Sequence, residues 1–311
     1  MANKIPRVPV REQDPQIRAT NFEEVCYGYD LDEARLEASR CLHCRNPRCV
    51  AACPVSIRIP DFIGALHTGE LQQAADIIAG DSSLPSICGR VCPQESQCEG
   101  SCILGIKGEP VAIGKLERFI GDWKLEHGAA AAQTAPRNGY KVAVIGSGPA
   151  GLSVAEYLNI RGHAVTVFER ADRVGGLLMY GIPNMKLDKA VIERRIRIMQ
   201  AEGVEFRTSM DVGGAVPAEQ LLADFDAVVL CCGAKKPRDP NVPGRDAKGV
   251  HFAVDYLTSV TKSLLDSGFA DGKAINAAGK NVLVIGGGDT GNDCVATCLR
   301  QGCRSVAQLE M

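Results

Sequence analysis

The stretch from Val142 to Glu169, VAVIGSGPAGLSVAEYLNIRGHAVTVFE, constrains the fold most strongly. It reads as an apolar strand, a glycine turn, a helix and a second strand, the order of a parallel βαβ unit. Gly146, Gly148 and Gly151 form G-x-G-x-x-G. The first glycine allows a tight turn, the second lets backbone amides approach a pyrophosphate, and the third lets the helix pack closely on the strand. Glu169 follows Gly151 by 18 residues, where a carboxylate accepts a hydrogen bond from a ribose 2′-OH. The stretch therefore predicts a dinucleotide-binding fold.

The same pattern returns in NVLVIGGGDTGNDCVATCLRQGCRSVAQLE, residues 281–310. Gly286, Gly288 and Gly291 repeat the fingerprint, and Glu310 ends the next strand 19 residues after Gly291. Two fingerprints predict two bound dinucleotides. A doubly wound sheet needs about a hundred residues or more to cover both its faces. Because the sequence stops at Met311, we expect it to be an N-terminal fragment whose last strand lacks its natural neighbours.

The composition narrows the class of protein. The chain has 311 residues, 45% apolar and 23% charged, which suits a soluble protein of two or three domains. Its net charge of −2 differs from the strongly positive charge that indicates binding to nucleic acid or to an anionic membrane. The first residues lack the apolar core of a signal peptide, and no apolar run approaches a membrane span. We therefore expect a cytoplasmic protein with neither nucleic-acid nor membrane partners.

The chain contains 14 cysteines. Since disulfides are rare in a compartment that keeps thiols reduced, this number needs another explanation. Eight of them form two runs near the N-terminus. The run CLHCRNPRCVAACPV has the spacing C-x2-C-x4-C-x3-C-P and contains Cys41, Cys44, Cys49 and Cys53. The run CGRVCPQESQCEGSC has the spacing C-x3-C-x5-C-x3-C and contains Cys88, Cys92, Cys98 and Cys102.

These spacings favour iron–sulfur clusters, because the C-P ending is typical of ferredoxin-like motifs. Structural zinc is the alternative, although zinc ribbons pair two C-x-x-C knuckles and only Cys41 and Cys44 make one here. The later cysteines lie in apolar strands or helices, where we expect buried structural thiols without a redox role. They are Cys231, Cys232, Cys294, Cys298 and Cys303.

The intervening segments predict mainly helices before the first fingerprint and alternating helices and strands after it. Helices are expected at 31–42, 59–78 with a break near Thr68 and Gly69, 113–126 and 250–267, and strands at 204–208 and 226–232. The segment 128–139 is the best linker candidate. The fold class is thus an α-helical domain (1–135), an α/β Rossmann-like domain (136–279) and the start of a second Rossmann-like domain (280–311).

Taken together, the cysteine runs, GSGPAGL, GGLLMYGIPNMKLDK, GAKKPR and GGGDTGND resemble a known family. It is the family of the small (β) subunit of bacterial glutamate synthase. Its relatives are the large subunit of NADH-dependent ferredoxin:NADP⁺ oxidoreductase, sulfide dehydrogenase and the N-terminal half of dihydropyrimidine dehydrogenase. The resemblance covers nearly all of the chain. It implies a helical domain with two 4Fe–4S clusters, followed by an FAD domain that an NAD(P)H domain interrupts.

The resemblance also implies roles for individual positions. The adenosine diphosphate half of FAD would be held by Gly146, Gly148, Pro149, Ala150, Gly151 and Glu169. The flavin side would be lined by Gly175, Gly176 and Leu177, with Gly233 closing beneath the cofactor. NADPH or NADH would be received by Gly286, Gly288, Asp289, Thr290, Gly291 and Glu310. The family's late glycine–aspartate motif lies beyond Met311, so the fragment alone is expected to bind FAD poorly and to have little activity.

Cluster ligation has two readings. The simpler one gives each run of four cysteines its own cluster. In ferredoxin-type runs, however, the cysteine before the proline ligates the other cluster, which would move Cys53 to the second run and leave Cys88 as an alternative ligand only. Dihydropyrimidine dehydrogenase fills the vacated place with a side-chain oxygen, and the matching residue here is Glu117. This reading predicts Cys41, Cys44, Cys49 and Glu117 on one cluster and Cys53, Cys92, Cys98 and Cys102 on the other.

The resemblance implies an NAD(P)H-dependent flavin iron–sulfur oxidoreductase with no catalytic side chain, because hydride passes between cofactors. In one reading it is the electron-input subunit of glutamate synthase, serving a large glutamate-forming subunit. In another it exchanges electrons between ferredoxin and nicotinamide pools with a small ferredoxin-reductase-type flavoprotein, or serves as a sulfide dehydrogenase subunit. A zinc-stapled interaction module without catalysis is the third. Glu310 favours NADH by repelling a 2′-phosphate, but relatives with an acid there include NADPH enzymes.

Overall fold

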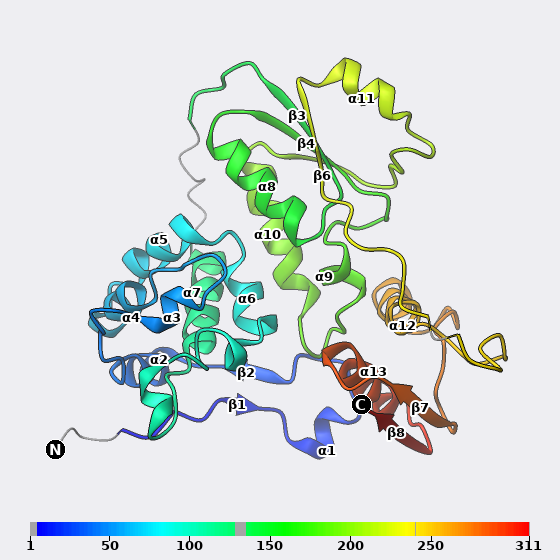
Figure 1. The fold of residues 1–311 in the computed structure, drawn as a ribbon, viewed down its shortest axis with the longest axis horizontal. Helices are drawn as coiled ribbons and strands as arrows, with labels where there is room; N and C mark the ends of the chain where they lie inside the picture. Colours follow the sequence, from blue (N-terminus) through cyan, green and yellow to red (C-terminus); the bar gives the residue numbers. More distant parts are fainter. Residues whose placement is uncertain (1–4, 128–134, 240, 311) are drawn as a thin grey trace. The chain divides into compact units, whose positions relative to one another are not determined.

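The chain divides into two compact units in a computed structural model that describes residues 5–127, 135–239 and 241–310. The first unit contains residues 5–13, 25–127 and 190–202, and the second contains 14–24, 135–189, 203–239 and 241–310. Most of the predicted linker, residues 128–134, lies outside the described residues. Each unit is described by itself below (Figure 1).

Short helices make up the first unit. The elements in chain order are β1 (Arg11–Glu12), β2 (Cys26–Gly28), α2 (Leu31–Ala38), α3 (Arg48–Ala51), α4 (Ile59–Thr68), α5 (Leu71–Asp81), α6 (Pro85–Val91), η1 (Gln94–Ser96), η2 (Ile103–Ile106), α7 (Ile113–His127) and nearly all of α10 (Lys189–Ala201). The predicted break in 59–78 is confirmed, because Gly69 adopts a left-handed conformation that ends α4. The helix predicted over 31–42 ends earlier, at Ala38, so that Cys41 lies in the loop that follows it.

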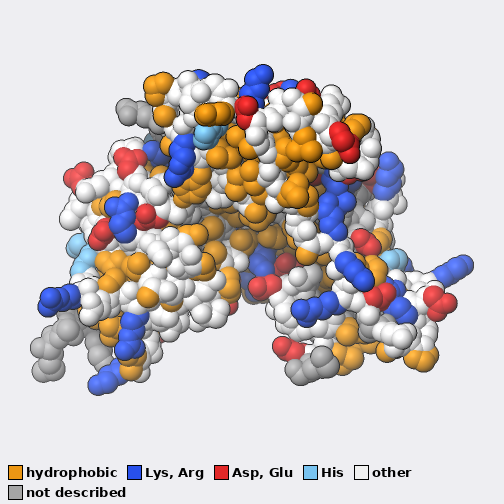
Figure 2. All heavy atoms as spheres, turned by 45° about the horizontal axis from the view of Figure 1, so that its top comes forward, with side chains coloured by type: hydrophobic (Ala, Val, Ile, Leu, Met, Phe, Trp, Pro, Cys, Tyr) orange, Lys and Arg blue, Asp and Glu red, His pale blue; other side chains and the backbone are white. Residues whose placement is uncertain are grey.

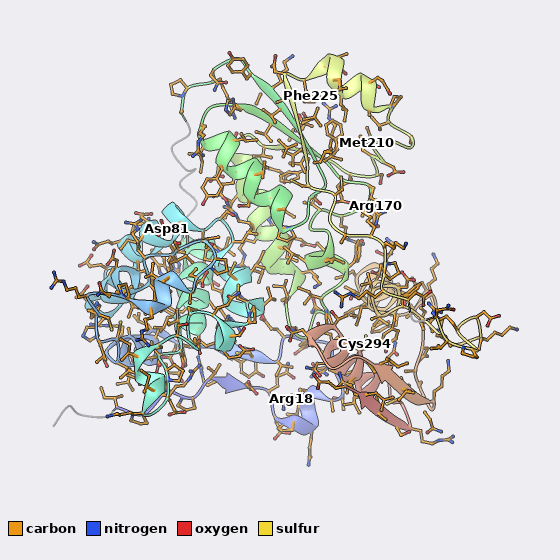
Figure 3. All side chains as sticks on the ribbon, in the orientation of Figure 1. Arg18, Asp81, Arg170, Met210, Phe225 and Cys294 are labelled. Carbon is orange, nitrogen blue, oxygen red and sulfur yellow. The ribbon has the colours of Figure 1, made fainter. Side chains whose placement is uncertain are left out.

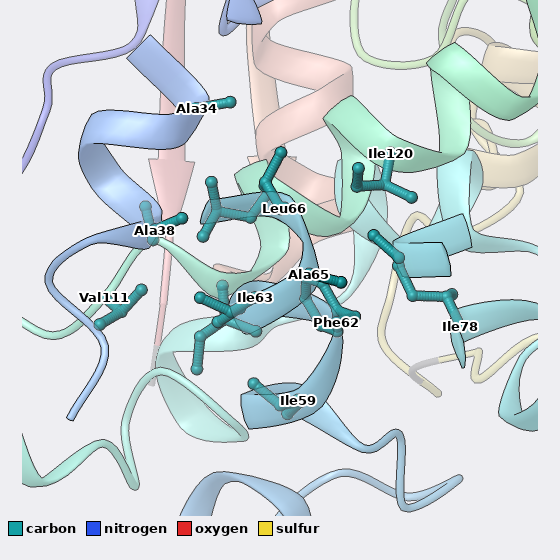
Figure 4. Close-up of a cluster of buried hydrophobic side chains, with 14 of the residues drawn as sticks. Ala34, Ala38, Ile59, Phe62, Ile63, Ala65, Leu66, Ile78, Val111 and Ile120 are labelled. Atoms are coloured by element: carbon teal, nitrogen blue, oxygen red, sulfur yellow. The ribbon is translucent and has the colours of Figure 1, made fainter. Parts of the chain in front are cut away.

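Apolar side chains from α2, α4, α5 and α7 form the core of this unit. Phe62, Leu66, Ile78 and Leu116 have essentially no exposed surface, and Figure 4 shows most of this cluster around α4. Helices α6 and α7 cross at Gly89, where an added Cβ would lie 2.5 Å from the backbone nitrogen of Arg118. A side chain at position 89 would therefore push α7 away from α6.

A four-stranded parallel sheet organises the first part of the second unit. Its strand order is β5 (Glu205–Arg207), β4 (Ala164–Phe168), β3 (Lys141–Ile145) and β6 (Ala227–Leu230). The other elements here are α1 (Pro15–Arg18), α8 (Pro149–Ile160), α9 (Leu177–Tyr180) and α11 (Ala218–Asp224). Ala143, Ile145, Phe168 and Leu221 form a core cluster, with Met210 and Phe225 packed against it (Figure 3). The βαβ order predicted over 142–169 is confirmed.

The remainder of the second unit repeats this arrangement on a smaller scale. Strands β7 (Asn281–Ile285) and β8 (Ser305–Leu309) pair in parallel, and helices α12 (Ala253–Ser267) and α13 (Asp289–Arg300) pack with them. Cys294 and Cys298 are buried in this core, as predicted, whereas Cys232 is exposed because β6 ends before it, at Leu230. Leu283, Ile285 and Leu309 are exposed on the strands.

Figure 2 shows side chains of both charges, Lys and Arg as well as Asp and Glu, on the face that it draws. This distribution agrees with the near-neutral net charge of −2.

Candidate functional site

Three glycines shape the turn between β3 and α8. Gly146 has φ +101°, and an added Cβ there would lie 2.4 Å from the carbonyl oxygen of Cys231. A Cβ on Gly151 would lie 1.9 Å from the carbonyl oxygen of Gly146. By contrast, a Cβ on Gly148 would meet no atom within 4 Å. The first and third glycines are therefore required by the protein itself, while the space at Gly148 is open for a group from outside.

The open space lies at the N-terminus of α8. Gly148 is the N-cap residue, Pro149 occupies the first helical position, and no side chain caps this end. The free backbone N–H groups and the helix dipole attract an anion at this point. The turn therefore fits the pyrophosphate of a dinucleotide such as FAD.

Glu169 directly follows β4, the second strand of this βαβ unit, and is buried. Its Oε2 accepts hydrogen bonds from the backbone N–H of Ser147 at 3.0 Å and from Ser147 Oγ at 2.5 Å, and its Oε1 accepts one from the Ala171 N–H at 2.8 Å. Ser147 Oγ in turn accepts from the Gly175 N–H at 2.9 Å. Glu169 thus fixes the fingerprint turn and the following loop, and its contact with a ribose stays a prediction.

The sequence pattern did not indicate a role for Ser147, which stands between two fingerprint glycines. Its hydroxyl is hydrogen-bonded to Glu169 and to Gly175, so it joins the fingerprint turn to the end of β4 and to the following loop. Gly176 follows Gly175, the hydrogen-bond partner of Ser147. Gly176 has φ +55°, and an added Cβ on it would lie 2.9 Å from the Cα of Gly148. Gly175, Gly176 and the exposed Leu177 therefore lie beside the fingerprint turn. Gly233 has φ +64°, with open space at its Cβ position.

The second fingerprint has a similar geometry between β7 and α13, except that an added Cβ on Gly286 would meet no atom within 4 Å. Gly286 has φ +121°, an added Cβ on Gly288 would meet nothing within 4 Å, and one on Gly291 would lie 2.2 Å from the Gly286 carbonyl oxygen. Asp289 is the first residue of α13, and Thr290 the second. Glu310 follows β8, and its side chain lies against Gly287. The second turn thus fits the pyrophosphate of another dinucleotide.

In the first unit, four cysteines from both runs line one cavity. They are Cys41, Cys44, Cys49 and Cys102. The remaining lining is mostly apolar and includes Leu42, Ile59 and Ile63, with Arg48 and Ser101 as its polar members.

Burial raises the pKa of the Cys41 thiol, and nearby Cys102 and Cys44 raise it further. The pKa of Cys49 rises to about 11 for the same reasons, with Cys102 and Cys41 as its neighbours. Four thiolates in such a cavity need cationic charge among them, and an iron centre supplies it.

The other cysteines of the two runs gather around α6 and α7. Cys88 is hydrogen-bonded to Cys92, which raises the pKa of Cys88 and lowers that of Cys92 to about 7. Burial raises the pKa of Cys98 to about 12, and the charges of nearby Glu99, Glu117 and Cys53 add to the effect. These mutual effects on the pKa identify a second group of neighbouring side chains, made up of Cys53, Cys88, Cys92, Cys98 and Glu117.

Glu117 is only 7% exposed, and among the residues that the structure describes its Oε1 has no hydrogen-bond partner. Burial raises its pKa to about 8, and Cys92 contributes. A buried carboxylate without a partner is costly unless a cation or a proton neutralises it. The donor set of this group therefore fits an iron–sulfur cluster with one oxygen ligand.

Two side chains have other neighbours than we expected. We expected Glu117 beside Cys41, Cys44 and Cys49, and Cys102 in the second group. Cys102 lines the cavity with the first three cysteines, and Glu117 lies near Cys92 and Cys98. Helices α6 and α7 approach closely at Gly89, so the first turns of α7 lie against α6. Cys102 instead ends the loop that enters the cavity with Ile103. Which residues ligate iron stays a prediction.

Across the described ranges 5–127, 135–239 and 241–310, no three His, Cys, Asp or Glu side chains converge closely enough to hold a single metal ion. A 4Fe–4S cubane, in contrast, takes one ligand on each of its irons and so needs its four ligands apart from one another.

Comparison with known proteins agrees with both halves of this description. Residues 18–129 match the family described as dihydropyrimidine dehydrogenase domain II, 4Fe-4S cluster, and residues 140–311 match the pyridine nucleotide-disulphide oxidoreductases. No helix among the described residues is long and apolar enough to span a bilayer.

Similar full-length proteins come from bacteria and yeast. The chain is 46% identical to the Bacillus subtilis glutamate synthase [NADPH] small chain, over 98% of this chain and 64% of that protein. It is 39% identical to the corresponding small chain of Halomonas elongata, over 98% of this chain and 67% of that protein. Glutamate synthase [NADH] of Schizosaccharomyces pombe is 46% identical over 96% of this chain and 14% of that protein. The chain thus spans about two thirds of the length of the bacterial relatives.

The fold and the two kinds of site define a pyridine-nucleotide flavoprotein with an iron–sulfur domain. Within that class, the chain belongs to the glutamate synthase small-chain family. The predicted family resemblance and fold class are confirmed.

Proposed function

We propose that this chain is the electron-input part of a glutamate synthase, working in the cytoplasm with a large glutamate-forming subunit. When bound, FAD would accept a hydride from NADPH or NADH, and two 4Fe–4S clusters would carry single electrons away from the reduced flavin. The observation that carries the proposal is the combination of two open glycine turns in one unit with two cysteine groups in the other. Domain boundaries at 135 and 279 belong to the same proposal.

The chain's own residues would bind, orient and shield these groups. Gly148 and Gly288 leave room for pyrophosphates at helix N-termini. The hydrogen bonds of Ser147 hold the loop that contains Gly175 against the first turn, so that the turn and the loop share one geometry. The buried side chains of Ile59 and Ile63 would shield one side of the first cysteine cavity.

For iron ligation, we propose Cys41, Cys44, Cys49 and Cys102 for one cluster. We propose Cys53, Cys92, Cys98 and Glu117 for the other. Cys88 then serves as a second-group thiol that donates to Cys92 without being required for ligation. The neighbour relations of the two groups support this division.

The test begins with anaerobically purified protein. Iron, acid-labile sulfide and flavin are measured, and NADPH or NADH is then added while flavin absorbance and electron paramagnetic resonance are recorded. We expect bleaching of the flavin and signals from reduced clusters. Zinc in place of iron would contradict the proposal.

The partner is tested separately, by adding the large subunit with 2-oxoglutarate and glutamine and measuring glutamate. Formation of glutamate supports the proposal. Reduction of ferredoxin without glutamate formation would indicate the ferredoxin:NAD(P)⁺ oxidoreductase reading instead.

A further inference from the structure

A lysine from the segment between α9 and α10 reaches the first turn of α13. The Nζ of Lys186 lies 3.5 Å from Asp289 Oδ1 and 3.4 Å from Asp293 Oδ1. The Lys186 side chain is 30% exposed, that of Asp289 is 73% exposed, and that of Asp293 only 12%. About a hundred residues separate the lysine from the two acids in the sequence, so the fold rather than local geometry brings them together.

The two acids stand at the place where the second fingerprint offers its anion site. Asp289 directly follows Gly288, and Asp293 lies one helical turn further along the same face. A carboxylate in the first turn of a helix stabilises that helix, but here it also repels a pyrophosphate approaching the same N–H groups. Two unneutralised carboxylates would therefore weaken dinucleotide binding.

Lys186 supplies the compensating charge. Burial raises the pKa of Asp293, and the ammonium group of Lys186 acts in the opposite direction and favours the ionised acid. Lys189 also acts on Asp293, but its amine is buried and donates to the carbonyl oxygens of Leu178 and Ile182.

We propose that Lys186 is a positioning residue of the nicotinamide-dinucleotide site, which neutralises Asp289 and Asp293 so that a pyrophosphate can bind at the N-terminus of α13. This inference rests on the proposed function, because it takes the second fingerprint as the NAD(P)H site. Lys186 acts through the two acids and need not touch the nucleotide. Through these ion pairs, Lys186 also links the segment after α9 to α13, the proposed nucleotide-binding helix. Helix α9 itself follows Gly175 and Gly176, the predicted flavin-side glycines.

The role of Lys186 in binding can be separated from a role in stability. Partly exposed ion pairs contribute only about 0–1 kcal/mol to folding. Removing the lysine should therefore leave the folded protein largely intact while changing the potential at the anion site. Affinity, measured without turnover, is the informative quantity.

The experiment is a double-mutant cycle on the oxidised full protein with FAD bound, using calorimetric titration with NAD⁺ and with NADP⁺. We expect K186Q to weaken binding of the preferred nucleotide about tenfold. K186R should bind like the wild type, because it keeps the charge. The double variant K186Q/D289N should recover most of the loss, since it removes one of the charges that the lysine offsets.

K280Q is the matched control. Lys280 precedes β7 in the same nucleotide-binding segment, and its amine donates to the carbonyl oxygen of Asn276. Its replacement should leave the affinity unchanged.

The inference is overturned if K186Q binds as tightly as the wild type, or if K186Q/D289N stays as weak as K186Q, which would indicate direct contact with the nucleotide. If the wild type binds neither nucleotide, the proposed function itself fails, and that result is distinct from the other two.

Discussion

At the scale of single residues, the glycines of the first fingerprint differ in what an added methyl group would contact. The G148A substitution keeps an ordinary φ of −64° and meets no atom of the protein within 4 Å, so the fold should survive. The new methyl group would occupy the space predicted for the FAD pyrophosphate. We expect a purified variant with normal thermal unfolding and little bound flavin, measured as the ratio of flavin to protein absorbance. Normal flavin content would show that the site is misassigned.

The control for G148A is G151A, whose methyl group would lie 1.9 Å from the Gly146 carbonyl oxygen. That clash is with the protein and not with a ligand. G151A should therefore lower the unfolding temperature even without flavin.

Lys189 offers a prediction on pH. Burial lowers its pKa to about 7, whereas an unfolded lysine titrates near 10.4. Between these values the unfolded chain binds more protons than the folded one, so the free energy of unfolding should rise with pH. The slope from this residue is at most about 1.4 kcal/mol per pH unit. Denaturant unfolding at pH 7, 8 and 9 should show this rise in the wild type and a smaller one in K189M. Equal slopes would contradict the prediction.

At the scale of elements, the crossing of α6 and α7 decides where the second cysteine group forms. A Cβ at position 89 would lie 2.5–2.7 Å from backbone and side-chain atoms of Arg118. We expect G89A to destabilise the first unit by about 2 kcal/mol, as overpacking does, and to lower the iron content, because Glu117 precedes Arg118 on α7. Thermal unfolding and iron analysis measure the two effects. G105A is the control, since its nearest contact would be an ordinary 3.6 Å. Unchanged stability and iron content in G89A would contradict this account.

The elements also show what the sequence could predict. Apolar runs and glycine spacing were enough for both βαβ units, because turn, helix and strand are local. The break at Gly69 followed from the same kind of reasoning. The neighbours of Cys102 and Glu117 could not be predicted, since they depend on how α7 crosses α6, a contact between helices that spacing does not encode. Ser147 could have been noticed as the one polar side chain within the first fingerprint turn. Lys186 gave no signal, because its partners lie about a hundred residues away.

At the scale of the whole molecule, the proposed function requires the two units to cooperate while each keeps its own chemistry. The glycine turns lie in the second unit and the cysteine groups in the first. Damage to one cysteine group should therefore leave nucleotide and flavin binding intact. Electron delivery beyond the flavin should fail.

The C44S substitution tests this separation. Cys44 lines the cavity with Cys41, Cys49 and Cys102, and a hydroxyl is a poor replacement for a thiolate ligand to iron. We expect C44S to lose about half of its iron while flavin content and bleaching by NAD(P)H stay near wild type. Glutamate formation with the large subunit should fall at least about a hundredfold, because metal-ligand losses remove the centre itself. C232S is the matched control: Cys232 is an exposed thiol outside both groups, so its iron content and glutamate formation should match the wild type. Full glutamate formation by C44S would show that this cavity is not on the electron path.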